Sequence, residues 1–205
     1  MKLFSFVQGS KRYIGSKEKA KEVALSVRGE EGTTGRTEVW GVFTSQNGEE
    51  IAEIAKFSGL QAVQLHDSES RHALEKLNEI LPGEVRRIFA SGVDGDGQVK
   101  DLGLASEALQ KGWLKAERDF LLVDGLTPGA GEVFPWEKFQ KPEGAGDLPM
   151  ILAGGLSAEN VEEAVKVLRP FGVDVSSGVE EPVGSGTKCV QRIGEFLGKA
   201  QAASF

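Results

Sequence analysis

The chain has 205 residues, a length that suits a single α/β domain with a full hydrophobic core. Its net charge of −7 and its pI of about 5.1 argue against nucleic acid or an anionic membrane surface as the main partner. A single cysteine excludes an internal disulfide bond and a cysteine-rich metal site, which favours a reducing compartment, either the cytoplasm or an organelle stroma or matrix. With no apolar run near the roughly 20 residues of a membrane span and no signal-peptide pattern, we expect a soluble chain.

Short apolar strands and amphipathic helices alternate along the whole sequence, with no linker or shift in composition between them. The predicted strands cover residues 2–7, 38–45, 61–68, 84–92, 119–125, 149–155 and 173–178. The segments after them, helical where a periodic face is present, cover residues 16–27, 48–59, 70–83, 103–114, 134–141, 157–168 and 188–200. Such alternation predicts a parallel sheet with right-handed crossovers, built from seven strand–helix units.

Seven units are one fewer than the eight that close a (β/α)8 barrel. We therefore predict a TIM-barrel-like α/β fold with only seven βα units, in one domain over residues 1–205 that is incomplete at its N-terminus. A flavodoxin-like or other doubly wound sheet is the alternative, because seven units without closure can open out.

The segment "MILAGGLSAENVEEAVKVL" places two glycines, Gly154 and Gly155, between a buried strand and a helix. Ser157 stands where a helix N-cap belongs, and one helix face recurs at Val161, Ala164, Val165 and Leu168. Glycine lets backbone N–H groups approach a ligand, and a helix N-terminus favours an anion, which suggests a phosphate site. From this segment alone, a βα turn without a ligand is an equal alternative.

Polar and small residues gather at the predicted C-terminal ends of the strands, where barrels place their active sites. His66 and Asp67 follow the third strand, and Asp124 ends the fifth. Small residues follow both of the last two strands, at Gly154 and Gly155 and again at Ser176–Gly178. The loops after the final pair of strands commonly bind phosphate in barrels, so this arrangement favours the phosphate site over an empty turn.

Five motifs in order, "GVFTS", "AVQLH", "LLVDG…PGAGEVFPW", "LAGGLSAENV" and "GVDVSSGVE", resemble the signatures of phosphoribosylanthranilate isomerase, a barrel enzyme of tryptophan biosynthesis. The resemblance extends over nearly the whole chain. It implies an Amadori rearrangement, without a cofactor or a metal, of N-(5'-phosphoribosyl)anthranilate to 1-(2-carboxyphenylamino)-1-deoxyribulose 5-phosphate. In that family a carboxylic acid on one strand opens the ribose ring, and a cysteine on another moves a proton from C2'.

The resemblance also implies roles for individual residues. Asp124 aligns with the general acid, although an Asp-Gly pair alone more often caps a turn. Arg12 aligns with the arginine that grips the anthranilate carboxylate, a task suited to a bidentate donor. His66 aligns with a pocket-lining histidine, and a merely structural strand-end histidine is an equal alternative. The remaining expected substrate-binding residues are Gly129, Gly131, Gly154, Gly155, Ser176, Ser177 and Gly178.

Several positions depart from the family's pattern. The family begins with a strand that carries the catalytic cysteine, whereas the segment 2–14 here aligns with the family's second strand and loop. Cys189 begins the predicted final helix without a basic partner, so we expect a packing role for it. The loop 128–132 lacks a hydroxyl and carries Glu132 where the family has lysine, and Asp67 replaces a glycine. Added negative charge is expected to weaken binding of an anionic substrate.

Two hypotheses therefore stand. In the first, the chain is an isomerase whose leading βα unit is absent from the sequence given or comes from another polypeptide. In the second, it is an inactive isomerase fold kept as a structural or interaction subunit. Because unpaired strand edges are covered in stable proteins, both hypotheses predict that the position of the missing unit is filled. A segment of a protein partner, water, or direct pairing of the strands on either side are the alternatives.

Overall fold

The computed structural model describes residues 2–10, 13–29, 37–125, 134–141, 143–145 and 147–203. The strands are β1 (Lys2–Ser5), β2 (Val39–Phe43), β3 (Ala62–Leu65), β4 (Arg86–Val93), β5 (Phe120–Gly125), β6 (Met150–Leu152) and β7 (Gly172–Val173). The α-helices are α1 (Lys17–Gly29), α2 (Gly48–Ser58), α3 (Ser68–His72), α4 (Leu74–Ile80), α5 (Leu102–Gln110), α6 (Val161–Leu168) and α7 (Val190–Ala203). Short 3-10 helices are η1 (Trp136–Lys138), η2 (Glu143–Ala145) and η3 (Ser177–Val179).

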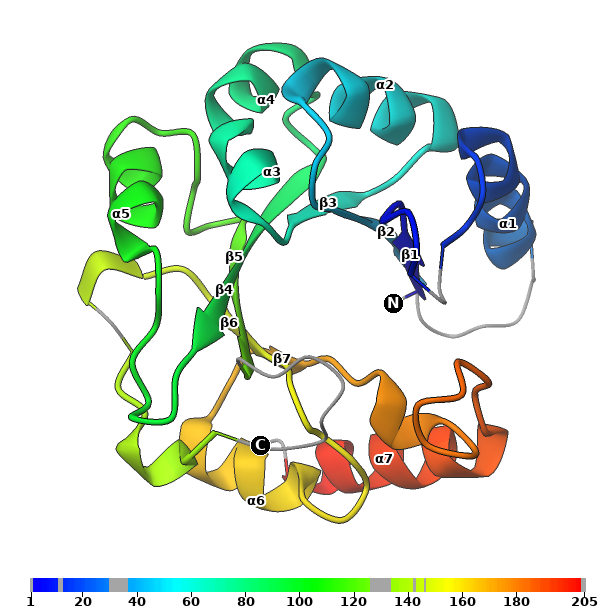
Figure 1. Ribbon diagram of the computed structural model, residues 1–205, viewed down its shortest axis with the longest axis vertical. Helices are drawn as coiled ribbons and strands as arrows, with labels where there is room; N and C mark the ends of the chain where they lie inside the picture. The colour runs from blue at the N-terminus through cyan, green and yellow to red at the C-terminus, as the bar shows by residue number, and fades with distance from the viewer. Residues whose placement is uncertain are drawn as a thin grey trace. The chain divides into compact units, whose positions relative to one another are not determined.

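The seven strands form one sheet in the order of the sequence, from β1 to β7 (Figure 1). Each pair for which the register is defined is parallel. The order and direction agree with the prediction of consecutive βα units, because a short right-handed crossover places each new strand beside the previous one. By contact, the chain divides into two compact units, residues 1–90 with 103–120 and residues 91–102 with 121–205.

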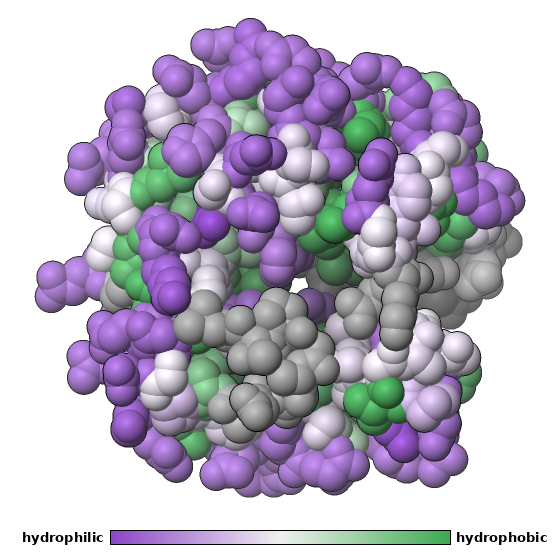
Figure 2. All heavy atoms as spheres, viewed as in Figure 1, coloured by the Kyte–Doolittle hydropathy of each residue, from purple (hydrophilic) through white to green (hydrophobic). Residues whose placement is uncertain are grey.

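In the first unit, α1, α2 and α4 pack in succession along strands β1 to β3 (Figure 1). The wholly buried apolar side chains of these elements include Phe43, Ile51, Leu65, Leu74 and Leu77. Over the outer helices of this unit, hydrophilic residues predominate (Figure 2). On α1, Ala20 and Ala24 are both buried.

The best-defined helix of this unit is α2, and its ends follow from local sequence. The Asn47 side chain accepts the N–H of Glu50, and the Glu50 carboxylate accepts the N–H of Asn47 in return. Such a reciprocal pair satisfies two N–H groups that the first turn leaves free. At the other end Gly59 takes a left-handed conformation, with φ of 66°, and its N–H donates a hydrogen bond to the Ala55 carbonyl. Glycine adopts this conformation without steric cost, so the helix stops there.

The single helix predicted over residues 70–83 is wrong in detail, because two short helices occupy this region. α3 begins earlier, after Asp67, whose side chain accepts the N–H of Ser68. At Ala73 the backbone has φ of −72° and ψ of −8°, which ends α3 and starts α4. With this break, α3 begins at its polar N-cap, Asp67, and α4 buries Leu74 and Leu77. Hydrophobic periodicity alone does not reveal the break.

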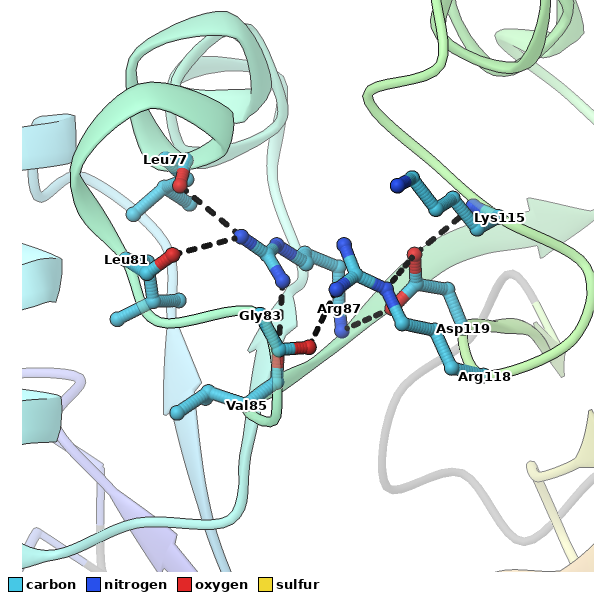
Figure 3. A network of polar contacts seen from close by, with 8 residues as sticks. All are labelled: Leu77, Leu81, Gly83, Val85, Arg87, Lys115, Arg118 and Asp119. Carbon is cyan, nitrogen blue, oxygen red and sulfur yellow. Dashed lines mark hydrogen bonds and ion pairs between the residues drawn. The ribbon is translucent and has the colours of Figure 1, made fainter.

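A buried polar network connects α4 with the start of β4 and β5 (Figure 3). The Arg87 side chain is 1% exposed, and its guanidinium donates to the carbonyls of Val85, Leu77 and Leu81 at 2.7, 3.0 and 3.2 Å. The last carbonyls of a helix lack partners within it, so a cation at the end of α4 both satisfies them and opposes the helix dipole. Burial lowers the pKa of Arg87 from its usual value, with the charge of Arg118 acting in the same direction.

Asp119, immediately before β5, forms the other half of the network (Figure 3). It is wholly buried and accepts the N–H groups of Arg87 and Lys115, both at 2.8 Å, and the Nε of Arg118 at 3.3 Å. Arg118 also donates to the Gly83 carbonyl. Buried charges are tolerated only when they are paired and hydrogen-bonded, and this carboxylate meets both conditions. The network therefore holds the chain segments at the N-terminal ends of two neighbouring strands.

In the second unit, β5, β6 and β7 are flanked by α6 and α7, which pack against each other (Figure 1). Leu122, Ile151 and Gly172 lie in register across the three strands. Buried apolar residues of strands and helices fill its core, among them Leu121, Val123, Leu152, Val161, Ala164 and Phe196. No helix among the described residues is long and apolar enough to cross a membrane.

Candidate active site

The candidate site lies at the C-terminal ends of β5, β6 and β7, all within the second unit. Asp124 follows four buried residues of β5, residues 120–123, and is itself only half-buried. Burial raises the pKa of Asp124 from its usual 3.8 to about 6, although a hydrogen bond with the Gly125 backbone acts in the opposite direction. A carboxyl group with this pKa is present partly as the neutral acid near neutral pH, which a proton donor requires.

Gly154, at the end of β6, lies directly against this carboxyl group. It has φ of +86°, and a Cβ built at this position would stand 2.4 Å from the N of Gly125 and 2.6 Å from Oδ1 of Asp124. Gly155 follows with φ of +64°. Two features thus require glycine at position 154, the left-handed backbone and the absence of room for any side chain. The glycine pair lets the end of β6 approach the acid closely.

The predicted N-cap at Ser157 is wrong, because α6 begins at Val161 and Asn160 precedes it. The intervening residues form a turn fastened by the Asn160 side chain. Its Oδ1 accepts the N–H of Ser157 at 2.9 Å, and its Nδ2 donates to the Gly155 carbonyl at 2.9 Å. The two left-handed glycines send the chain into a turn before the helix, so the helix starts later than an N-cap at Ser157 would place it and begins with its first periodic apolar residue, Val161. The predicted helix face is confirmed at Val161, Ala164 and Val165, which are buried.

The segment after β7 packs onto the turn that follows β6. A Cβ at Gly178 would stand 2.0 Å from the carbonyl oxygen of Leu156 and 3.0 Å from Cα of Ser157. η3 begins at Ser177. The N–H of Val179 donates to the Ser176 carbonyl at 3.4 Å, and the N–H of Glu180, just after η3, donates to the Ser177 carbonyl at 3.0 Å. The structure therefore places Gly178 against Leu156 and Ser157, the residues that directly follow the glycine pair 154–155.

Four backbone N–H groups at this junction are available to a ligand. Among the described residues, the N–H groups of Gly154, Gly155, Ser177 and Gly178 have no hydrogen-bond acceptor. Buried or half-buried N–H groups normally find a partner in protein, water or ligand. Free N–H groups next to glycines with positive φ are a feature of anion sites, such as those that bind phosphate.

His66 belongs to the first unit and lies at the end of β3. It is half-buried, and its Nδ1 lies 3.1 Å from Nε2 of Gln64, a side chain that is 3% exposed. Its role in substrate binding stays a prediction. Arg12, Gly129 and Gly131, the remaining expected contacts with substrate, lie outside the described residues.

Cys189 immediately precedes α7, and its N–H donates to the Val179 carbonyl at 2.9 Å. The thiol is half-buried. Among the described residues, no three His, Cys, Asp or Glu side chains lie close enough together to hold a metal ion.

Sequence reasoning missed three residues that shape the site, namely Asn160, Glu180 and Lys188. Asn160 fastens the turn after β6, while Glu180 and Lys188 flank the turn after β7. The sequence gives no signal for the burial of Glu180, because a carboxylate next to a single apolar residue is ordinarily exposed. Nothing in the spacing of the sequence indicates its partner eight residues later.

Comparisons with known proteins agree on the family. A family model described as "N-(5'phosphoribosyl)anthranilate (PRA) isomerase" matches residues 2–199. The N-(5'-phosphoribosyl)anthranilate isomerase of Bacillus cereus is 37% identical over 168 residues, which are 80% of this chain and 73% of that protein.

Solved structures lead to the same family. The phosphoribosyl anthranilate isomerase of Thermotoga maritima is 31% identical, with a TM-score of 0.70 over 98% of this chain and 87% of that one. Another isomerase structure, in complex with reduced 1-(o-carboxyphenylamino)-1-deoxyribulose 5-phosphate, is 30% identical with a TM-score of 0.66 over 98% and 86% of the two chains. These likenesses and the seven parallel strands confirm the predicted TIM-barrel-like class over the doubly wound alternative. The chain belongs to the N-(5'-phosphoribosyl)anthranilate isomerase family.

Proposed function

We propose that this chain catalyses the isomerisation of N-(5'-phosphoribosyl)anthranilate in tryptophan biosynthesis, with Asp124 as the general acid. The observation that carries the proposal is the position of Asp124, a carboxyl group with pKa raised to about 6, directly against the glycine turn of β6. An acid and an anion site thus stand side by side. The substrate has a ribose ring oxygen to be protonated and a 5'-phosphate to be held, and the two features match these two needs.

The chemistry assigned to Asp124 is the opening of the ribose ring. The neutral carboxyl donates its proton to the ring oxygen while the C1'–O bond breaks, and the electron pair of the anilino nitrogen forms a protonated Schiff base. Loss of the C2' proton then gives an enol amine, which becomes the ketone by tautomerisation, so no oxidant or reductant is consumed. Because a general acid works best with a pKa near the working pH, the environment of Asp124 suits this step.

The phosphate is assigned to the four free N–H groups of Gly154, Gly155, Ser177 and Gly178. Backbone donors fixed in two packed turns need no reorganisation when the anion binds, which favours both affinity and precise placement. Arg12, His66, Gly129, Gly131 and Ser176 complete the proposed substrate contacts. The net charge of −7 makes this local anion site, rather than the overall field, responsible for attracting the substrate.

The base for the C2' proton is proposed to come from an additional strand–helix unit, on a longer form of this chain or on a partner protein. β1 and β7 are the terminal strands of the sheet order, so each has an edge at which a further strand can pair. The chain also covers 73% of the Bacillus cereus relative and 87% of the Thermotoga maritima structure, so part of each lies outside the match. The single cysteine and the chemistry are compatible with a reducing compartment, cytoplasm or organelle stroma or matrix.

The test is an isomerase assay on the purified chain and on the same chain joined to the first βα unit of the Thermotoga maritima isomerase. We expect turnover with the extended chain, loss of that turnover in its Asp124→Asn variant, and little or none with the chain alone. Turnover by the chain alone would refute the proposal that the base comes from outside. Absence of turnover in both folded proteins would refute the proposed activity and favour an inactive subunit, for which the comparisons offer no support.

A further inference from the structure

The residues after η3 fold back on the phosphate turn, Ser176–Gly178, as a small hairpin. Glu180 and Lys188 pair as an isolated antiparallel bridge, and the N–H of Glu181 donates to the Thr187 carbonyl at 3.0 Å. This hairpin contacts the turn that bears two of the four free N–H groups. Its side chains are therefore placed to control the geometry of that turn.

Lys188 makes the direct connection. Its Nζ donates to the carbonyl of Ser176 at 2.8 Å and to Oε1 of Glu180 at 3.0 Å, with Oγ of Ser176 at 3.4 Å. Ser176 is the residue just before η3, and Glu180 is the residue just after it. One ammonium group thus joins both ends of the turn, and all three of its protons have acceptors.

The buried carboxylate of Glu180 fixes the position of the Lys188 ammonium group by an ion pair. Its side chain is 1% exposed, and its second oxygen accepts the N–H of Gly186 at 3.0 Å. A buried carboxylate is costly without a cation, so the Glu180 side chain fixes where the ammonium must lie. Lys188 itself remains 38% exposed, so replacing it leaves no void in the core.

We infer that Lys188 is a positioning residue for the phosphate end of the substrate, acting through the Ser176 carbonyl to aim the N–H groups of Ser177 and Gly178. The peptide between Ser176 and Ser177 carries both the carbonyl that Lys188 binds and the Ser177 N–H. Because that peptide is planar, fixing the direction of the carbonyl also fixes the direction of the N–H. This inference rests on the proposed function, since it assigns Lys188 to the phosphate site of that reaction.

The inference predicts a division between binding and chemistry. Lys188→Met keeps the length of the side chain and removes its donors, so KM for the phosphorylated substrate rises about tenfold or more while kcat changes by less than about threefold. Lys188→Arg retains a cation and donors, so it restores most of the affinity. Lys166→Met is the matched control, because Lys166 forms an exposed pair with Glu162 on α6, away from the turn.

Phosphate binding is measured directly, by titrating the wild type and each variant with inorganic phosphate and following the backbone N–H resonances of Ser177 and Gly178. The extended chain of the assay above supplies KM and kcat. We expect the wild type, Lys188→Arg and Lys166→Met to show saturable shifts at these two residues, and Lys188→Met to require about tenfold more phosphate. Thermal unfolding of each variant confirms that the comparison is made on folded protein.

The outcomes separate the inference from the proposed function. Equal phosphate affinity in the wild type and in Lys188→Met would overturn the role of Lys188 and leave the isomerase proposal intact. No shift in the wild type at any phosphate concentration would overturn both the phosphate site and the role of Lys188. A fall in kcat with unchanged KM in Lys188→Met would also overturn the inference, because it would assign Lys188 to the chemical step.

Discussion

Two carboxyl groups at opposite ends of β5 show how one strand serves two purposes. Asp119, just before the strand, is wholly buried and accepts three hydrogen bonds, one from a charged arginine (Figure 3). Asp124, near the end of the strand, is half-buried against two glycines, and its pKa is raised to about 6. The first carboxylate has every partner it needs and holds the fold together. The second has few, so its ionisation is penalised and its proton is available for chemistry.

Burial alone therefore does not distinguish a structural carboxylate from one proposed to be catalytic. What differs is the number of donors around each group, and this number follows from the neighbouring residues. Lys115 and Arg118 lie in the loop that leads to Asp119, whereas Gly125 and Gly154 bring no side chains to Asp124. Barrels commonly separate stability and activity between the two ends of their strands, and this strand follows that division.

The largest effect is expected from Asp119→Ala. The change leaves the N–H groups of Arg87 and Lys115 without an acceptor and Arg118 without its counter-ion, so we expect a loss of about 3–5 kcal/mol in the free energy of unfolding. Urea unfolding gives this value. Glu107→Ala is the control, because its pair with Lys111 is exposed and is expected to contribute less than about 1 kcal/mol. Similar losses in the two variants would contradict a structural role for Asp119.

The next effect concerns the close approach of β6 to the acid. Gly154→Ala would force a Cβ to within 2.4 Å of the Gly125 N, in addition to the strain of a positive φ. We expect a loss of about 3 kcal/mol or more in the free energy of unfolding. Gly112→Ala is the control, because Gly112 also has a positive φ, +70°, but open space where a Cβ would lie. We expect it to lower the free energy of unfolding by only about 1–2 kcal/mol. Equal urea midpoints for the two variants would show that the close contact relaxes at little cost.

Asp124→Asn tests the other end of the strand. We expect turnover of the extended chain to fall by at least about a hundredfold, equivalent to about 2.7 kcal/mol in the activation barrier. KM should stay close to the wild-type value, and the free energy of unfolding should not fall, because the amide occupies the same space without the charge whose burial is unfavourable. Steady-state kinetics and urea unfolding measure both. A stability loss as large as that of Asp119→Ala would remove the distinction between the two carboxyl groups.

The smallest effect is the dependence of stability on pH. The folded-state pKa of Asp124, about 6, lies above the value of 3.8 expected in the unfolded chain, so the folded protein binds the proton more tightly. Stabilisation by this proton is present below about pH 4 and is lost as the pH rises to about 6. Relative to Asp124→Asn, wild-type stability should fall by the order of 2 kcal/mol over this interval and stay level above it. Parallel stability curves for the two proteins would show that the pKa of Asp124 is not raised.

Much of this arrangement was predictable from sequence because it depends on local signals. Buried strand segments such as residues 120–123 and 150–152 are short apolar runs, and the helix face at Val161, Ala164 and Val165 follows a simple period. The position of Asp124 at a strand end is equally local. Its raised pKa is not, because it depends on how closely Gly154 approaches from another strand.

The features that escaped prediction involve side chains far apart in sequence or turns with several solutions. Periodicity did not locate the break at Ala73, since buried positions continue across it, from Ser70 in α3 to Leu74 in α4. The late start of α6 depends on hydrogen bonds from Asn160 to Ser157 and Gly155. These bonds form only once two left-handed glycines have turned the chain. Such choices between a cap and a turn are decided by tertiary packing rather than by propensity.

The contact between Gly178 and Leu156 limits which amino-acid substitutions this protein can accept at position 178. Every missense mutation at codon 178 introduces a carbon atom about 2.0 Å from the Leu156 carbonyl oxygen, a distance that no adjustment of a side chain can relieve. Gly194 and Gly198 on α7 have open space around them, and alanine there would gain about 1 kcal/mol of helix propensity. Selection is therefore expected to retain only synonymous changes at codon 178, while codons 194 and 198 drift freely. We therefore expect the evolutionary conservation of each glycine in this chain to depend on how closely other backbone atoms approach it, rather than on the flexibility of its own backbone.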